Sequence, residues 1–367
     1  MRPELPATAP AFLAKAGWEG AICTPLAGDA STRQYFQVNL AAKTAILMSA
    51  PAGLETAICP PDASVQDRQN LGYTAMARLA ANDCRAFVGL AQELANRGFS
   101  TPAILAADIP VGLILLEDLG KNLFAALLQQ QPNLERELYE NAVAVLAALT
   151  RSSFGVEFEY RDQNWPVQTY DRTALMVETA LLDEWYFPFC GIATTTNLQS
   201  TLNQAWHQVL DGITRGPTGL VLRDFHAENL IWLPERAKTS NIGLLDFQDA
   251  VFGHPAYDLV SLLQDARRDV DPMLETPMIE HFIALAHWPD KAEFLTAYRI
   301  LGAQRAAKIL GIFVRLARRD GKSHYLSFLP RVERYFTANL GHKELAPVAD
   351  ILRPLLPKLF NGGQPAS

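Results

Sequence analysis

The sequence contains few cysteines, and none of them form a pair typical of metal or redox sites. Cys23, Cys59, Cys84 and Cys190 are widely separated along the 367 residues, and no C-x-x-C motif occurs. Zinc binding by thiolates and dithiol redox chemistry therefore have little support. We interpret the four side chains as free thiols in a reducing cytosol, where cysteine packs readily as a small apolar residue.

Clustered positive charge is also missing. Lys and Arg number 32 against 39 Asp and Glu, which gives a formal net charge of −7 and a pI near 5.6. Proteins that bind nucleic acid present grouped Lys and Arg to the phosphates, and no such stripe occurs here. We therefore expect no nucleic-acid partner.

The sequence has no long uninterrupted hydrophobic run. Residues 1–10 include three prolines and lack the apolar stretch of a signal peptide. The most apolar region, residues 102–116, is interrupted by Asp108 and Pro110. It is also shorter than the roughly 20 residues that span a bilayer. We expect a cytoplasmic protein with no membrane partner.

What is present describes a packed α+β protein. Hydrophobic residues make up 49% and charged residues 19%, a composition that can bury a core. Short β-prone runs at 34–38 and 44–48 predict a hairpin, and apolar spacing over 85–97 predicts a helix. Residues 120–367 show mainly helical periodicity. We therefore predict a small β-rich N-lobe over 1–119 and a large, mainly helical C-lobe over 120–367.

One β-hairpin is predicted inside the helical part. Two apolar runs flank the polar segment 234–241. We expect Ile231 to pair with Leu244, which would place Asn229 beside Asp246 at the open end of the hairpin. The Asp246 carboxylate and the Asn229 carboxamide would then lie next to each other as two oxygen donors.

Three polar residues in this region suit phosphoryl transfer. Asp224 precedes Asn229 by five residues in the run RDFHAEN, and Asp246 begins the run DFQ. Hard oxygen donors without thiolates favour Mg²⁺ over zinc. Phosphoryl transfer needs a carboxylate beside the attacking hydroxyl and a metal at the phosphates. We assign the first role to Asp224 and the second to Asn229 and Asp246.

Each of these residues taken alone also has a plain structural interpretation. Asp224 could cap a turn, Asn229 could begin a strand and Asp246 could end one. Their order and spacing, D-x-x-x-x-N followed by D-F after a hairpin, favour the kinase interpretation. For His226 we favour a structural role, because the sequence offers no nucleophile for it to activate.

Several sequence runs resemble a known superfamily. The runs are GLVLRDFHAEN at 219–229, IGLLDFQDA at 242–250 and HPAYDLVSLLQDARRD at 254–269. They resemble the aminoglycoside phosphotransferase and choline kinase superfamily. Three N-terminal runs are similar to its anomeric sugar kinases of N-acetylmuramate and N-acetylglucosamine: GDASTRQYFQV at 28–38, AILMSAP at 45–51 and LLEDLG at 115–120.

This resemblance implies a protein-kinase-like two-lobe fold that uses ATP and Mg²⁺. It implies a loop over the phosphates and a hinge whose backbone binds adenine. It also implies that Asp258 braces the loop of the catalytic Asp224. The implied ATP-binding residues are Gly28, Asp29, Ala30, Ser31 and Arg33 in the loop, and Leu116, Glu117 and Leu119 in the hinge.

The sequence departs from the superfamily at the phosphate-binding lysine. Met48 stands where the third strand should carry this Lys, and Phe87 stands near the position of its Glu partner. We expect Arg33 to replace the lysine, because a guanidinium can bind phosphate oxygens in pairs. A solvated hairpin arginine is the alternative.

The acceptor site is predicted on the helical lobe. Its candidate residues are Glu184, Trp185, Asp265 and Arg267. Aromatic rings pack on pyranose faces, and polar groups satisfy sugar hydroxyls. Such aromatic residues also occur as ordinary core residues.

The leading functional prediction is an ATP-dependent kinase that phosphorylates the anomeric hydroxyl of an amino sugar, N-acetylmuramate or N-acetylglucosamine, in cell-wall sugar recycling. One alternative is an aminoglycoside kinase or a kinase of amino alcohols such as choline or homoserine. Another is a catalytically silent nucleotide-binding scaffold, motivated by the missing lysine. The small-molecule partner is thus a sugar in the leading case, and the oligomeric state stays open.

Overall fold

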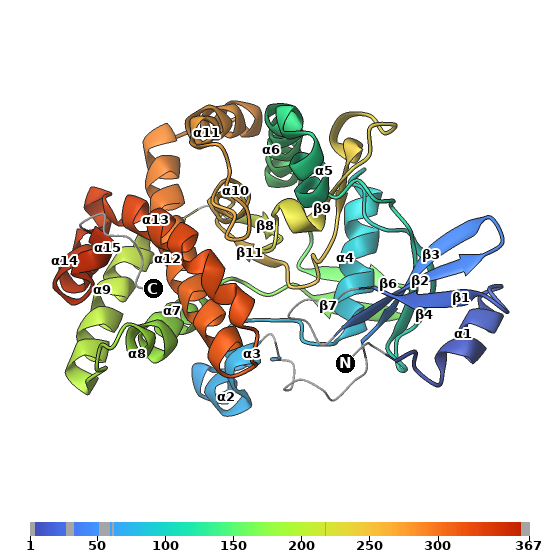
Figure 1. Cartoon of the computed structure of the whole chain (residues 1–367), viewed down its shortest axis with the longest axis horizontal. Helices are drawn as coiled ribbons and strands as arrows, with labels where there is room; N and C mark the ends of the chain where they lie inside the picture. The colour runs from blue at the N-terminus through green and yellow to red at the C-terminus, as the bar shows by residue number, and fades with distance from the viewer. Residues whose placement is uncertain (1–3, 27–32, 51–58, 61, 217, 361–367) are drawn as a thin grey trace. The chain divides into compact units, whose positions relative to one another are not determined.

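The computed structural model describes residues 4–26, 33–50, 59–60, 62–216 and 218–360. The chain divides into two compact units. Unit 1 contains residues 1–141, 154–168 and 228–250, and unit 2 contains residues 142–153, 169–227 and 251–367. Figure 1 labels their elements.

Unit 1 is built on a five-stranded antiparallel sheet with the order β1-β2-β3-β5-β4. Its strands are β1 (Ile22–Pro25), β2 (Gln34–Leu40), β3 (Lys43–Ser49), β4 (Ile104–Asp108) and β5 (Leu113–Glu117). The predicted hairpin is confirmed, because β2 and β3 pair through a tight turn at Ala41, whose φ is +51°. Met48 lies opposite Tyr35 in β2 and Ile114 in β5.

One face of this sheet forms the core of unit 1 with the first helix. Helix α1 (Ala9–Lys15) contributes Leu13 to a buried cluster that also contains Trp18, Phe36 and Leu47. Alternate residues of a strand point to the same face, so Phe36 and Val38 share this side. Each such side chain contributes ~1.5–3 kcal/mol by leaving water.

Helix α4 (Cys84–Asn96) confirms the helix predicted over 85–97. Its N-cap is Asp83, whose side chain accepts a hydrogen bond from Arg85 N. The helix ends before Gly98, whose φ of +82° is easily reached by glycine. The rest of unit 1 comprises α2 (Val65–Leu71), α3 (Tyr73–Met76), α5 (Phe124–Gln130), the hairpin of β6 (Glu157–Tyr160) with β7 (Gln163–Pro166), and the first part of α6 (Glu135–Arg151).

The second predicted hairpin is present, but its predicted register is wrong by one residue. Strands β9 (Leu230–Trp232) and β10 (Ile242–Leu244) pair with Ile231 opposite Gly243, not Leu244. A Cβ on Gly243 would lie 3.3 Å from Ile231 Cβ and 2.9 Å from Leu119 Cδ1. A side chain at this position would therefore crowd Ile231 and displace the end of the Leu119 side chain. Asn229 therefore lies opposite Leu245, whose N–H donates to the Asn229 carbonyl, and Asp246 follows one residue later.

Unit 2 is mainly helical around one long helix. Helix α12 (Lys291–Arg318) packs against α7 (Arg172–Leu181), α10 (Ala256–Leu263) and α13 (Leu329–Leu340). The other elements are the π-turn η2 (Leu182–Tyr186), α8 (Phe187–Phe189), α9 (Thr196–Arg215), α11 (Pro272–Ala286), α14 (Ala346–Leu355), α15 (Pro357–Phe360) and the strand pair β8 (Gly219–Val221) with β11 (Val251–Gly253).

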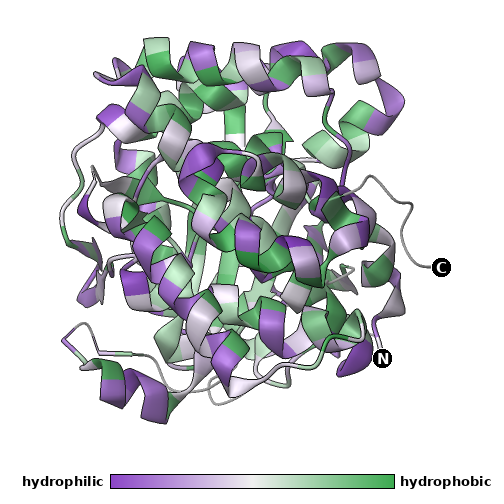
Figure 2. Ribbon diagram, turned by 90° about the vertical axis from the view of Figure 1, so that its left-hand side faces the viewer, coloured by the Kyte–Doolittle hydropathy of each residue, from purple (hydrophilic) through white to green (hydrophobic). Residues whose placement is uncertain are grey.

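The helices of Figure 2 carry hydrophobic and hydrophilic residues on different sides, as helices that bury one face do. Within the described part of the chain, no helix combines the length and apolar character needed to cross a membrane. The sheet of unit 1 and the helices of unit 2 confirm the α+β class. The lobe boundary predicted near Gly120 stays a prediction.

Candidate active site

The two predicted metal ligands lie at the open end of the β9–β10 hairpin in unit 1. Asn229 ends the short 3₁₀ turn Ala227–Asn229, and Asp246 follows β10 with a φ of +53°. Asp and Asn enter this left-handed region more readily than other residues with a side chain. The Asp246 carboxylate accepts a hydrogen bond of 2.7 Å from Gln248 Nε2, and its side chain is 41% exposed. The side chain is thus partly accessible at the protein surface.

An aromatic contact ties helix α4 to the segment after Asp246. Phe87 stacks on Phe247 with 5.0 Å between the ring centroids and 27° between the planes. Phe87 stands where the superfamily resemblance led us to look for a Glu, and both it and Met48 are buried. An apolar contact therefore links α4 to this segment, and the sequence alone did not reveal it.

Arg33 is held against the same segment. Its Nη1 lies 3.1 Å from Asp246 Oδ1, and its Nη2 donates to the Ala81 carbonyl and lies 3.8 Å from Asp249 Oδ2. The Arg33 side chain is only 9% exposed. The alternative of a solvated hairpin arginine is therefore wrong. The predicted loop residues Gly28, Asp29, Ala30 and Ser31 lie outside the described residues.

The predicted hinge residues make contacts within unit 1. Leu116 and Glu117 belong to β5, where Glu117 N donates to the Ala103 carbonyl. The Glu117 carboxylate binds Arg236 Nη2 at 2.7 Å, and Leu119 is buried against Gly243. These side chains thus stabilise the sheet and the hairpin. Adenine binding by their backbone stays a prediction.

The loop that carries Asp224 is fixed within unit 2. The Asp258 carboxylate accepts hydrogen bonds from Leu222 N at 2.6 Å and Arg223 N at 2.8 Å, which confirms the bracing role. Arg305 Nη1 donates to the Arg223 carbonyl, and Arg223 has a φ of +71°. The backbone next to Asp224 is therefore held through both its donors and its acceptor.

Burial and nearby charges shift the pKa values of two side chains in this loop, Asp224 and His226. Burial alone would raise the pKa of Asp224, but Lys308 and Arg305 outweigh it and hold the pKa below its usual value. Burial lowers the pKa of His226 to about 4, although Asp265 acts in the opposite direction. At neutral pH, Asp224 is ionised and His226 is neutral.

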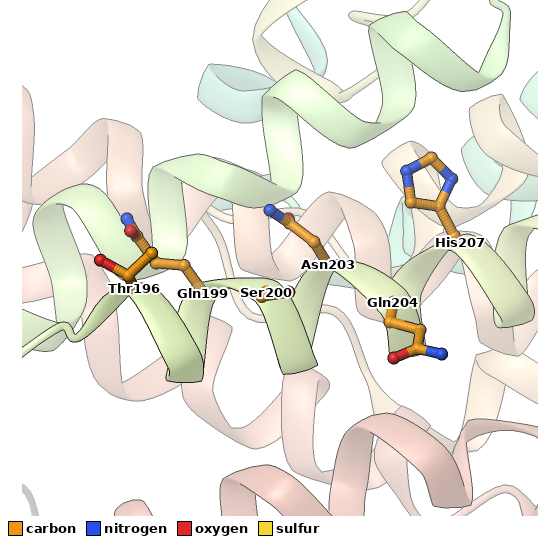
Figure 3. Close-up of a pocket in the computed structure, with 6 residues that line it drawn as sticks. All are labelled: Thr196, Gln199, Ser200, Asn203, Gln204 and His207. Carbon is orange, nitrogen blue, oxygen red and sulfur yellow. The ribbon is translucent and has the colours of Figure 1, made fainter.

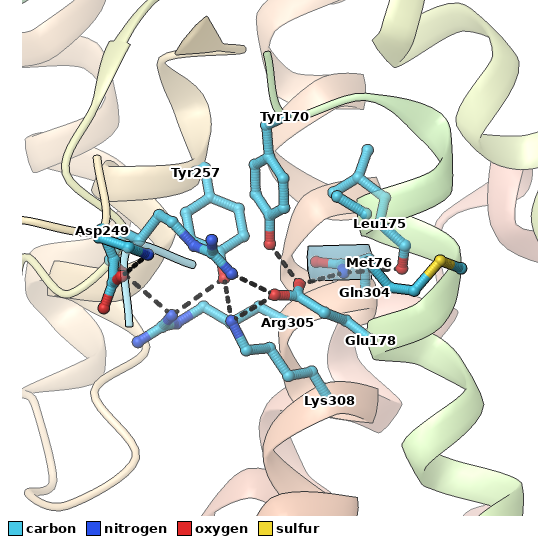
Figure 4. Close-up of polar contacts among 12 residues, drawn as sticks. Met76, Tyr170, Leu175, Glu178, Asp249, Tyr257, Gln304, Arg305 and Lys308 are labelled. Carbon is cyan, nitrogen blue, oxygen red and sulfur yellow. Dashed lines mark hydrogen bonds and ion pairs between the residues drawn. The ribbon is translucent and has the colours of Figure 1, made fainter. Parts of the chain in front are cut away.

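A buried charge network around Glu178 binds Arg223 of the Asp224 loop. Glu178 has no exposed side-chain surface, and its carboxylate meets Lys308 Nζ at 2.8 Å, Gln304 Nε2 at 3.0 Å and the Arg223 guanidinium (Figure 4). The Tyr170 hydroxyl also donates to Glu178. The sequence patterns did not predict this network. Its signal was charged residues inside apolar helices, Glu178 in α7 and Lys308 in α12.

The structure brings two of the four acceptor-site candidates to the Asp224 loop. The Asp265 carboxylate is buried and accepts hydrogen bonds from Ala227 N and Arg267 N. Arg267 Nη1 lies 3.5 Å from His226 Nε2. These contacts brace the end of the loop. Glu184, which is exposed, and Trp185, which is half-buried, belong to the π-turn η2, and among the described residues no hydrogen bond or ion pair joins them to the loop.

A surface hollow elsewhere in unit 2 does not coincide with these residues. It is lined by one helix, α9, through Thr196, Gln199, Ser200, Asn203, Gln204 and His207 (Figure 3). These side chains all come from one helix face and include no Asp, Glu, Lys or Arg, so they offer no converging chemistry. Among the described residues, no three His, Cys, Asp or Glu side chains converge to hold a metal ion. A magnesium ion that arrives with nucleotide needs only one or two protein oxygens, so the donor types of Asn229 and Asp246 fit it.

Comparison with known protein families shows to which family this chain belongs. Residues 22–294 match the phosphotransferase enzyme family. The chain belongs to this family. Phosphotransferase relatives with similar sequences include the N-acetylmuramate/N-acetylglucosamine kinase of Caulobacter vibrioides, which is 41% identical over 92% of both chains. The N-acetylmuramate/N-acetylglucosamine kinase of Pseudomonas aeruginosa is 31% identical over 90% of this chain and 88% of its own.

Solved phosphotransferase structures share the fold at low sequence identity. A choline/ethanolamine kinase family protein from Mesorhizobium loti is 15% identical, with a TM-score of 0.53 over 95% of this chain and 97% of its own. The GDP complex of aminoglycoside 2′-phosphotransferase-IIIa is 12% identical, with a TM-score of 0.54 over 89% and 97%. The predicted kinase-like fold is thereby confirmed.

Proposed function

We propose that this phosphotransferase is a cytoplasmic ATP-dependent kinase that phosphorylates the anomeric hydroxyl of N-acetylmuramate, N-acetylglucosamine or both, in cell-wall sugar recycling. The observation that carries the substrate class is the 41% identity to the Caulobacter vibrioides kinase along 92% of both chains. The observation that supports the reaction type is the braced loop of Asp224, in a chain whose family transfers phosphoryl groups.

Asp224 is the proposed catalytic residue. Its lowered pKa keeps the carboxylate ionised at neutral pH, so it can orient the acceptor hydroxyl and accept its proton. The hydrogen bonds from Leu222 N and Arg223 N to Asp258 hold the backbone that presents it. A fixed carboxylate favours reaction because the hydroxyl needs little further ordering.

Asn229 and Asp246 are the proposed magnesium ligands. Bound with ATP, the ion would neutralise charge on the β- and γ-phosphates. The Asp246 side chain is 41% exposed, so it is partly accessible at the surface. Gln248 holds the other part of the group through a 2.7 Å hydrogen bond and restricts its rotation.

Nucleotide and sugar binding complete the proposal. Arg33 and the loop of Gly28 to Ser31 would bind phosphates, and the backbone of Leu116 to Leu119 would bind adenine. Asp265 and Arg267 lie next to the Asp224 loop, which supports a place near the acceptor. Glu184 and Trp185 are proposed as sugar contacts from their residue types alone.

The test is ATP consumption with magnesium on N-acetylmuramate, N-acetylglucosamine, glucose, kanamycin, choline and homoserine, with phosphorus NMR of each product. A sugar 1-phosphate from either amino sugar is the expected result. Turnover of kanamycin or of an amino alcohol alone would contradict the proposed substrate.

The absent third-strand lysine favours one second candidate, a silent nucleotide-binding protein. Met48 is buried in the middle of the sheet, so it leaves no cation at this position. Measurable MgATP binding with no turnover of any acceptor would support this candidate over the kinase.

A further inference from the structure

Arg33 lies between two carboxylates at the proposed metal site. Its guanidinium contacts Asp246 at 3.1 Å and approaches Asp249 at 3.8 Å, and it also binds the Ala81 carbonyl. The neighbouring Ala80 N–H donates to Asp249 Oδ1 at 2.6 Å, so Asp249 has a fixed position. All these groups belong to unit 1. Arg33 is therefore a positioned cation rather than a mobile surface side chain.

The Asp246 carboxylate is the partner of the Arg33 guanidinium and also the proposed ligand of the magnesium ion. A single guanidinium charge compensates only part of the two negative charges of Asp246 and Asp249 in a partly buried place. A magnesium ion on Asp246 would bring two further positive charges close to Arg33, and like charges repel strongly where water is scarce. A metal ion and Arg33 would therefore compete for Asp246.

The phosphates of a bound nucleotide would give the Arg33 guanidinium another anionic partner in place of Asp246. Phosphate oxygens are anionic and accept paired hydrogen bonds from a guanidinium. Among the described residues of β2, β3 and β5, the single Lys or Arg is Lys43, at the exposed start of β3. These strands thus offer no inward cation for a triphosphate. Arg33, directly before β2, stands beside the metal carboxylate and can supply that charge.

We propose that Arg33 couples metal binding to nucleotide binding. In the nucleotide-free protein it occupies Asp246 and weakens the binding of a bare divalent ion. When the ion arrives with a triphosphate, the guanidinium exchanges Asp246 for phosphate oxygens. This inference rests on the proposed magnesium and ATP sites. It predicts that removal of Arg33 raises the affinity for a divalent ion alone and lowers the affinity for MgATP.

The experiment compares full-length wild type, Arg33→Met, Arg33→Lys and the control Arg85→Met. Arg85 binds Asp83 at the start of α4 and is 40% exposed, so its loss removes the same charge away from Asp246. Mn²⁺ binding without nucleotide is measured by electron paramagnetic resonance, and MgATP binding by calorimetry. Arg33→Met should bind Mn²⁺ alone about tenfold more tightly and MgATP about tenfold or more weakly. Arg85→Met should change neither affinity.

Arg33→Lys keeps the charge but loses the paired geometry. It should therefore bind Mn²⁺ alone like wild type and MgATP several-fold more weakly, which keeps the test decisive if Arg33→Met does not fold. Unchanged MgATP affinity in either variant, or Mn²⁺ affinity that falls in Arg33→Met, would overturn the coupling and leave only a structural ion pair. Sugar turnover is read separately: a wild type that binds MgATP but phosphorylates no sugar contradicts the proposed function, while the binding results still decide the role of Arg33.

Discussion

The Nζ atom of Lys308 lies 2.8 Å from a carboxylate oxygen of Glu178, a side chain with no exposed surface. Lys308 is also the first of the cations that keep the pKa of Asp224 low. Lys308 thus interacts with two carboxylates, the structural Glu178 and the proposed catalytic Asp224. The stability of unit 2 and the charge state of Asp224 are therefore linked through this side chain.

Replacement of Glu178 by Gln should strongly destabilise the protein. The change leaves Arg223 without the buried carboxylate of Glu178 and leaves Lys308 with Asp224, and an uncompensated buried charge costs about 3–5 kcal/mol. Urea unfolding at neutral pH measures the loss. The control is Glu280→Gln in α11, because its ion pair with Lys291 is more than half exposed and is worth about 0–1 kcal/mol. Equal losses in the two variants would show that the network contributes little.

Replacement of Asp246 by Asn should reduce kcat by about two orders of magnitude or more, because the proposed metal ligand loses its charge. Steady-state kinetics on the amino sugar that the wild type accepts measure this effect. Lys121→Ala is the matched control, since Lys121 is exposed in the segment after β5. A small and similar effect in both variants would remove Asp246 from the proposed site.

Sequence patterns predicted the parts of this fold that depend on local chemistry. The β2–β3 hairpin follows from alternating apolar residues around a polar turn, and α4 follows from helical spacing that stops at Gly98. Local order along the chain was sufficient for these elements. The roles of Asp224, Asn229 and Asp246 were proposed from their spacing along a loop and a hairpin, and they stay predictions.

Features that depend on tertiary packing were not predictable in the same way. In β9 and β10, Gly243 lies opposite Ile231 in a crowded place next to Leu119, and the pattern of apolar residues alone gave the wrong pairing. The contact between Arg33 and Asp246 joins residues 213 positions apart. Sequence could suggest a role for this arginine, but not the carboxylate that holds it.

Stability should depend on the charge of His226 in mildly acidic solution. Burial lowers its pKa to about 4, below the ordinary value of 6.5, so the unfolded chain binds more protons between these values. Stability from this group is present above about pH 6.5 and is lost as pH falls toward 4. Asp265 and Arg267 both act on the ring, Asp265 raising the pKa of His226 and Arg267 lowering it.

The variant His226→Asn isolates this contribution, because asparagine does not titrate. Urea unfolding of wild type and variant at pH 7.5, 6 and 4.5 should show the stability advantage of the wild type shrinking as the pH falls. A constant difference across the three pH values would mean that His226 does not titrate differently on unfolding.

The close approach of α12 to the end of α7 gives a sharp test of packing. A Cβ on Gly311 would lie 2.2 Å from the Leu181 carbonyl oxygen, and backbone atoms cannot move aside as a flexible side chain can. Gly311→Ala should therefore cost about 1–3 kcal/mol by forcing the two helices apart. Gly212 in α9 is the matched control, since no atom lies within 4 Å of its added Cβ. Gly212→Ala should instead raise stability by about 0.5–1 kcal/mol, because alanine loses less backbone freedom in a helix. The two variants make the same chemical change with opposite expected signs, so an increase in stability for Gly311→Ala would contradict the helix contact itself.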